Sequence, residues 1–182
     1  MKRIGFGQVE PNHLSAKRNG KIYAQLPAAS HIEVLENGMF AKYDYEANEV
    51  NFTGDGEWML VLNEVKLYDA DWRYQNIVGK KSTSGVYSGY AMKKGDFMDG
   101  VMVPRLFKTD IGDIFTTNCI KGTESAEGTE VNLGAYLVVG KDGYLAVSEA
   151  PQVEDLSGMV WKVVKVYTMP DGQEGVKLQR VQ

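Results

Sequence analysis

The stretch Val160-Trp161-Lys162-Val163-Val164-Lys165-Val166-Tyr167 decides the fold class of this chain. Apolar and charged side chains alternate along it, which is the period-two pattern of a half-buried β-strand. The alternation changes phase at Val163-Val164, which predicts a β-bulge or a bend from one sheet to another. A turn sequence, Pro170-Asp171-Gly172, and a second alternating run, Val176-Lys177-Leu178-Gln179, follow it. The sequence therefore predicts a β-hairpin here.

The same pattern recurs in the first half of the chain. Ala41-Lys42-Tyr43-Asp44-Tyr45 and Glu49-Val50-Asn51-Phe52 both alternate, and the short polar segment Glu46-Ala47-Asn48 joins them. These two runs predict a second hairpin. Trp58-Met59-Leu60-Val61-Leu62 is apolar at every position, which favours a central strand that is covered on both faces.

A third hairpin is predicted from Ala135-Tyr136-Leu137-Val138-Val139 and Tyr144-Leu145-Ala146-Val147. The connection Gly140-Lys141-Asp142-Gly143 contains Asp-Gly, a pair that favours the positive φ of a tight turn. No long stretch has the spacing of an amphipathic helix. The sequence therefore predicts an all-β protein of antiparallel barrel or sandwich modules built from hairpins.

The expected domain organisation has an arm, a body and a long loop. Residues 1–20 are expected to form an extended N-terminal arm that is dispensable for folding, and residues 21–182 the β body. The body could consist of two modules, 21–78 and 101–182, joined by the long central loop 79–100. A connection of this length inside a compact domain is usually functional or disordered, and the alternative is a loop folded back over its own body.

Composition indicates a globular protein and gives no sign of a membrane or secreted one. The chain has 182 residues, of which 43% are apolar and 24% charged, as in ordinary globular domains. No segment approaches the roughly 20 apolar residues of a membrane helix, so no membrane association is expected. The basic opening Met1-Lys2-Arg3 has no apolar run behind it, so we expect no secretory signal and synthesis in a cytoplasm.

Charge is unevenly placed, which suggests where a partner would bind. Residues 1–22 carry a net charge of +4, whereas the rest of the chain carries −8. A basic arm on an acidic body favours docking on an acidic partner, while a solvated terminus and an arm that closes its own barrel are the alternatives. The candidate partner-binding residues are Lys2, Arg3, Ile4, Phe6, Val9, Lys17 and Arg18 in the arm, and Tyr87 and Tyr90 in the loop.

The sequence contains no recognisable catalytic or metal-binding constellation. Cys119 is the only cysteine and lies in a β-prone run, which is typical of a small buried strand residue. The two histidines, His13 and His31, have no metal-ligand or nucleophile spacing around them, and Gly5-Phe6-Gly7 lacks the rest of a dinucleotide fingerprint. We therefore expect no catalytic residue, no cofactor and no metal. The acidic body also argues against nucleic-acid binding.

The turn-rich β pattern resembles small virion proteins of tailed bacteriophages, most of all the head decoration, or capsid cement, proteins. The resemblance is carried by residues 36–44, 138–145 and 161–167. It implies a non-enzymatic virion structural protein that binds and stabilises a capsid shell. It further implies the major capsid protein or other virion subunits as partners, and a homo-oligomer, a trimer in many members of that class.

A carbohydrate- or receptor-binding β module of a phage tail or surface protein is the rival interpretation. The chain has ten tyrosines and three tryptophans, which could line a sugar groove. Most of them are expected to be core residues and cross-strand partners instead.

Overall fold

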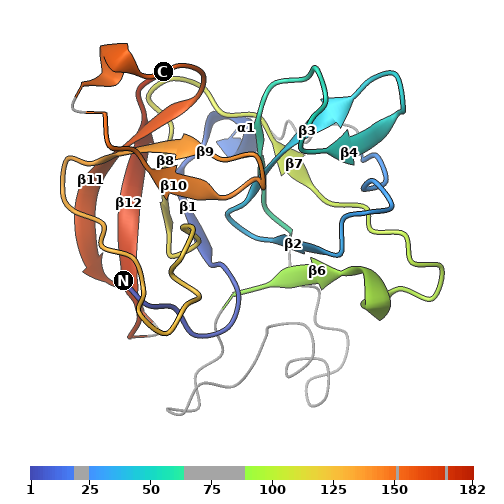
Figure 1. Ribbon diagram of the computed structural model, residues 1–182, viewed down its shortest axis with the longest axis horizontal. Helices are drawn as coiled ribbons and strands as arrows, with labels where there is room; N and C mark the ends of the chain where they lie inside the picture. Colours follow the sequence, from blue (N-terminus) through green and yellow to red (C-terminus); the bar gives the residue numbers. More distant parts are fainter. Residues whose placement is uncertain (19–24, 64–88, 151, 171) are drawn as a thin grey trace.

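The computed structural model describes residues 1–18, 25–63, 89–150, 152–170 and 172–182 (Figure 1). Within these ranges the chain is almost entirely β-structure, which confirms the predicted fold class. The strands are β1 Val9–His13, β2 Val34–Glu36, β3 Phe40–Asp44, β4 Glu49–Asn51, β5 Met59–Val61, β6 Ala91–Lys93, β7 Leu106–Phe107, β8 Ile114–Thr117, β9 Tyr136–Val139, β10 Leu145–Val147, β11 Val160–Thr168 and β12 Glu174–Arg180. The helical turns are α1 Ser15–Arg18, η1 Lys94–Asp96 and η2 Val153–Asp155.

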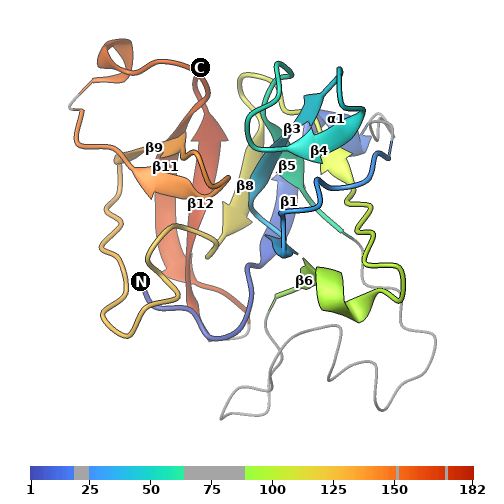
Figure 2. The same cartoon turned by 45° about the vertical axis from the view of Figure 1, so that its right-hand side comes forward.

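The strands form three open sheets. One has six strands in the order β1-β8-β12-β11-β9-β10, one has four in the order β4-β3-β5-β7, and β2 pairs with β6. Every pairing between these named strands is antiparallel. In the turned view β11 and β12 lie to the left and β3 and β4 to the right, with β8 and β1 between them (Figure 2).

The three predicted hairpins are present. Strands β3 and β4 pair through Lys42 opposite Asn51, and Asn48 in their turn has a φ of 57°, a left-handed conformation that asparagine tolerates. Strands β9 and β10 pair through Val139 opposite Leu145, with Gly143 at a φ of 79° in the turn. Strand β5 lies between β3 and β7 with all three residues buried, as its continuous apolar sequence predicted.

The predicted bulge lies in the third hairpin, between β11 and β12. Val163 stands opposite Leu178, but Lys165 stands opposite Lys177, so Val164 is the extra residue of β11. A one-residue insertion bends the strand and resets which side chains share a face. The phase change read from the sequence is therefore a bulge, with both flanks of β11 remaining in one sheet.

The two larger sheets pack face to face around one aromatic core. Trp161 and Phe115 of the six-stranded sheet meet edge to face with ring centroids 4.8 Å apart, and Phe40 of β3 lies 5.8 Å from Trp161. All three side chains have no exposed surface. The other face of the four-stranded sheet packs on a second buried cluster that includes Leu35 of β2. The four-stranded sheet is thus covered on both faces, which explains why its strand β5 is apolar at all three positions.

The N-terminal segment corrects the prediction of a separate arm. Strand β1 pairs with β8 at the edge of the six-stranded sheet, and Leu14 and Ala16 belong to the main core. Pro11 lies within β1, and proline is tolerated on an edge strand, where its missing N–H costs no ladder bond. The register also shifts between Glu10 and His13, around Pro11. The described residues 1–18 are therefore part of the body.

Sheet membership does not follow the two modules 21–78 and 101–182. Strand β7, from the second of these ranges, completes the sheet formed by β3, β4 and β5 of the first. In the expected loop 79–100, residues 79–88 lie outside the described residues, and residues 89–100 contain β6 and η1. Strand β6 pairs with β2, so this part of the loop is anchored to the body.

Candidate functional site

The densest group of polar side chains lies around Arg3 and Glu36. The Arg3 guanidinium contacts both carboxylate oxygens of Glu36, with Nη2 3.1 Å from Oε1 and Nη1 bonded to Oε2. Arg3 is 5% exposed and Glu36 6%. A bidentate contact of this kind is the strongest geometry that arginine and a carboxylate adopt. It ties the N-terminal segment to β2.

Two further donors complete the shell of Glu36. Tyr144 Oη donates to Oε1 at 2.5 Å, and the Gly7 N–H donates to Oε2 at 2.7 Å. Burial by itself disfavours the carboxylate, but the hydrogen bonds and charge of Arg3, with help from Tyr144 and Gly7, hold the pKa of Glu36 below its usual value. Burial likewise opposes the Arg3 charge, and Glu36 outweighs it, so the Arg3 pKa is raised. The pair is ionised at neutral pH.

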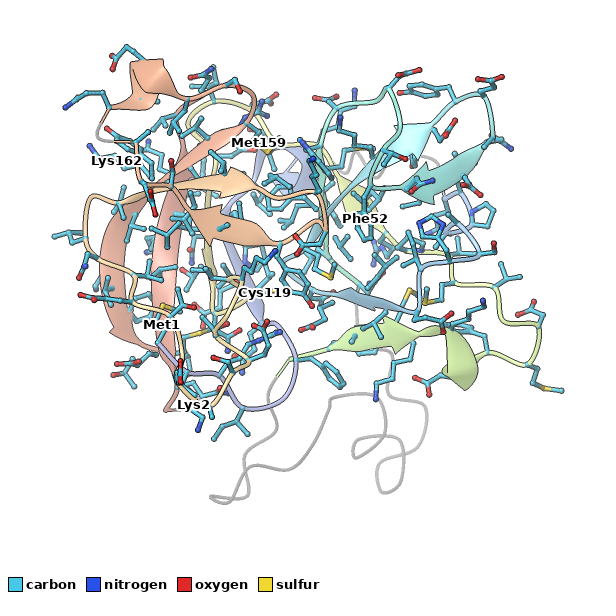
Figure 3. The ribbon with its side chains drawn as sticks, in the orientation of Figure 1. Met1, Lys2, Phe52, Cys119, Met159 and Lys162 are labelled. Atoms are coloured by element: carbon cyan, nitrogen blue, oxygen red, sulfur yellow. The ribbon has the colours of Figure 1, made fainter. Side chains whose placement is uncertain are left out.

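Cys119 lies beside this pair, in the interior between the sheets (Figure 3). Its Sγ is 3.9 Å from Arg3 Nη1, and it has no exposed surface. Burial, followed by the negative charge of Glu36, raises the pKa of the thiol. Burial and Glu36 raise the pKa of the Tyr144 phenol in the same way. A nucleophile needs a low thiol pKa and access, and a general base needs a pKa near the working pH.

The role of this cluster is therefore structural: its side chains hold the N-terminal segment against β2. Its carboxylate is already saturated with donors from its own chain, and its thiol is protonated and enclosed. Among the residues that the structure describes, no group of three His, Cys, Asp or Glu side chains could hold a metal ion.

The residues predicted to bind a partner fall into different environments. Lys2 is exposed and Ile4 is 43% exposed, whereas Val9 packs against the main core. Arg3 is buried against Glu36, which corrects its assignment to an exposed basic arm. Lys17 and Arg18 lie in α1, but their side chains, like all of Tyr87, lie outside what the structure describes.

The structure does bring Phe6 and Tyr90 close together, through the neighbouring Gly7. The Tyr90 N–H donates to the carbonyl of Gly7 at 3.1 Å, so the N-terminal segment and residues 89–93 are neighbours. Phe6 is half-buried, and Lys93 Nζ lies 4.7 Å from the centre of its ring. This contact is internal to the chain.

A second candidate surface lies at the free edge of β11, and the prediction did not include it. Strand β12 pairs with β11 along its length, but β9 pairs only with Val160–Lys162. The last bonds on that side are from the Val163 N–H to Ala135 O and from the Gly134 N–H to Val163 O, both 2.9 Å. Within the described part of the chain, residues 164–168 have no strand partner on this side (Figure 1).

Exposed apolar side chains accompany this edge. Val164 is 37% exposed and Val166 42%. Leu133 is 70% exposed and precedes Gly134, whose N–H donates to the Val163 carbonyl. Three exposed apolar side chains beside unpaired backbone groups are typical of a surface that binds a protein segment.

Lysines gather on one face of the same hairpin. Lys165 stands directly opposite Lys177, and Lys162 stands opposite Gln179, two residues from Lys177 on β12. Side chains two apart on a strand share a face, so Lys162, Lys165 and Lys177 point to the same side. Figure 3 shows Lys162 on the outer side of the six-stranded sheet.

Among the described residues, these lysines make no salt bridge. No ion pair in the described part of the chain involves any of the three. Lys165 Nζ lies 5.3 Å from the ring centre of Tyr167 and Lys162 Nζ 5.8 Å from that of Tyr136. We call the surface formed by Leu133, Lys162, Val164, Lys165, Val166 and Lys177 the β11 edge surface.

A signal for this surface was present in the sequence. Lysines three residues apart, as Lys162 and Lys165 are, point to opposite faces of a regular strand. The phase change at Val163-Val164 reverses that relation, so the predicted bulge already implied that both lysines share a face. The missing end of β9, in contrast, depends on tertiary pairing.

Comparison with known proteins returned no match to any family model, curated protein or solved structure. In the described residues no helix is long and apolar enough to cross a membrane.

Proposed function

We propose that this protein is a non-catalytic structural subunit whose function is to bind other protein subunits, and that it serves as a head decoration protein of a tailed-bacteriophage virion. One observation supports binding above all. Within the described residues, the β11 edge surface combines strand backbone without a strand partner, exposed Val164, Val166 and Leu133, and lysines that make no ion pair. Exposed apolar groups at an unfinished sheet edge cost solubility unless a partner covers them.

The buried polar cluster supports the non-catalytic part of the proposal. Its groups bind each other, and burial and charge move the pKa values of the Cys119 thiol and the Tyr144 phenol away from the range useful for acid–base or nucleophilic chemistry. Four of the aromatic side chains are closed to a sugar, since Trp161, Tyr43, Phe40 and Phe115 are enclosed in the body, whereas Tyr45 is 64% exposed.

The experiment that tests this proposal uses the native particle. Antibodies against the purified protein are applied to virions from cells in which the protein is naturally made, and the particles are imaged by negative stain. Labelling of heads supports the decoration role, and labelling of tails only, or of no particle, contradicts it. Light scattering of the purified protein gives its oligomeric state, for which the proposal expects three copies.

A substitution in the β11 edge surface tests whether this surface makes the contact with the particle. Val164→Asp placed on the β11 edge surface is expected to abolish rebinding to particles stripped of the protein. Ile111→Asp is the matched control, because Ile111 is 71% exposed in the turn before β8 and lies outside this surface. Equal rebinding of both variants would show that the contact lies elsewhere. A glycan array on which the wild-type protein binds specific sugars would favour the receptor-binding alternative.

A further inference from the structure

We infer that the β11 edge surface accepts an extended polypeptide segment of alternating acidic and apolar residues, which adds to the six-stranded sheet as a strand beside β11. This inference deepens the proposed function and rests on it for the identity of the partner. It goes beyond a general protein contact because the backbone, the apolar side chains and the lysines each specify one property of the segment.

The backbone specifies an extended strand. Val163 directs its N–H and its carbonyl away from β12, toward Ala135 and Gly134. Val163 stands opposite Leu178 and Val166 opposite Val176, two residues further along β12. Because antiparallel pairs two apart have the same bonding type, Val166 also directs its N–H and carbonyl away from β12. These groups point to the free edge, where an incoming strand finds a donor and an acceptor.

The lysines specify acidic side chains on one face of the segment. Lys165 and Lys177 are directly opposite each other, an arrangement of like charges that destabilises an isolated sheet. With Lys162 they place three positive charges at this end of the face, whereas Glu10 of the same row lies two strands from Lys177 and accepts from Tyr167 Oη at 3.1 Å. A segment with carboxylates on this face of the sheet would relieve the repulsion and steer the approach.

The opposite face specifies apolar side chains. Val166 is on the face opposite Lys165, since neighbouring residues of a strand alternate, and it is 42% exposed although its partner Val176 is fully buried. An added strand would continue the core over Val166 with its own apolar residues. Acidic residues on one side and apolar residues on the other give the alternation.

A second copy of the same edge fits less well. Pairing two β11 edges about a two-fold axis brings the Lys162 and Lys165 side chains of both copies onto one continuous sheet face, without any carboxylate between them. Lysine and bulges at a sheet edge are known devices against such self-pairing. The surface therefore favours a partner of opposite charge over itself.

The test measures fluorescence anisotropy of a labelled ten-residue peptide of alternating glutamate and valine, capped at both ends, against the wild-type protein. A peptide with glutamine in place of glutamate and a single-stranded thymidine oligonucleotide are the competing probes. The glutamate peptide should bind at least about tenfold more tightly than the glutamine peptide, and this difference should shrink as salt rises. Equal binding of both peptides, or no binding of either, would overturn the inference.

Two variants separate strand addition from simple attraction to lysines. Val166→Pro removes an N–H that points to the free edge and leaves the β11–β12 bonds intact, and it should weaken the glutamate peptide by about tenfold or more. Lys165→Glu should do the same, whereas Lys141→Glu, an equal charge change in the β9–β10 turn, should not. If Val166→Pro unfolds the protein, backbone pairing is tested instead with a glutamate peptide N-methylated at alternate residues. This peptide should bind no better than the glutamine peptide.

The remaining outcomes each contradict either strand addition or the virion role. Loss of binding with Lys165→Glu, together with unchanged binding of the N-methylated peptide or of Val166→Pro, would show a polyanion surface and overturn strand addition. Oligonucleotide binding as tight as that of the peptide would do so as well. Failure of the peptide assay with intact head labelling overturns this inference alone. Peptide binding without any labelled particle overturns the virion role and leaves this inference standing.

Discussion

The guanidinium of Arg3 grips the carboxylate of Glu36 at two points, and the contact joins the start of the chain to a strand of a different sheet from β1. Both side chains are almost completely removed from water. A buried pair gains little over an apolar replacement, but removal of one partner leaves an uncompensated charge inside the protein. The pair therefore makes the position of the N-terminal segment a condition of stability.

Arg3→Met should reduce the free energy of unfolding by about 3–5 kcal/mol, because Glu36 then stays buried without a cation. Urea denaturation followed by tryptophan fluorescence measures this change. Lys2→Met, at the exposed neighbouring position, should change it by less than about 0.5 kcal/mol. The double variant Arg3→Met/Glu36→Leu should recover part of the loss, and an Arg3→Met variant as stable as Lys2→Met would contradict the assignment.

Stability should fall in acid through Glu36. Although burial opposes its ionisation, its hydrogen bonds and Arg3 hold the folded pKa below the usual value. A lowered folded pKa stabilises the protein above the unfolded value, about 4.3 for glutamate, and this contribution is lost as the pH falls toward the folded value. Urea midpoints of the wild type should therefore drop more steeply below about pH 4.3 than those of Glu36→Gln. Parallel curves would refute this role.

Gly7 should tolerate no side chain. A Cβ at this position would collide with the carbonyl oxygen of Asn37 and lie 2.7 Å from Cys119 Cβ. Gly7→Ala should therefore cost about 1–3 kcal/mol of unfolding free energy. Gly95→Ala is the matched control, since nothing lies within 4 Å of a Cβ there, and it should change stability by less than about 0.5 kcal/mol. Thermal melts of the two variants make the comparison, and equal melts would contradict the close packing.

Removal of residues 1–13 should collapse the melting transition instead of leaving it intact. The deletion strips β1 from the edge of β8 and leaves Glu36 without Arg3. For a chain of this size each kcal/mol of lost stability lowers the melting temperature by about 2–4 °C, so we expect a drop of at least about 10 °C. Circular dichroism measures it. An unchanged melting temperature would instead support an N-terminal arm that is dispensable for folding.

Local patterns of sequence were sufficient for the hairpins and for the bulge. The turn at Gly140-Lys141-Asp142-Gly143 and the phase change at Val163-Val164 are encoded within a few residues, and each appears where its pattern lies. Strand β5 was also predictable, since a continuous apolar run fits a strand covered on both faces.

The fate of the N-terminal segment was not predictable in the same way. Its proline and glycines disfavour a central strand, yet they are compatible with an edge strand, and only the neighbouring β8 decides between the two. Arg3 read as a surface cation because its partner Glu36 is 33 positions away and no spacing rule connects them. The β11 edge surface was predictable only in part. The shared face of the lysines follows from the bulge, but the early end of β9 does not follow from any local pattern.

The pairing of β1 with β8 also has a consequence for the order of events during synthesis. Thr117 Oγ1 donates to the carbonyl of Gln8, 109 positions earlier in the chain. A growing chain leaves the ribosome N-terminus first, so residues 8–13 emerge long before the strand that will hold them. Contacts this distant in sequence also form slowly. Residues 8–13 are thus made early but are among the last to reach their places, and until then a chaperone can still bind them.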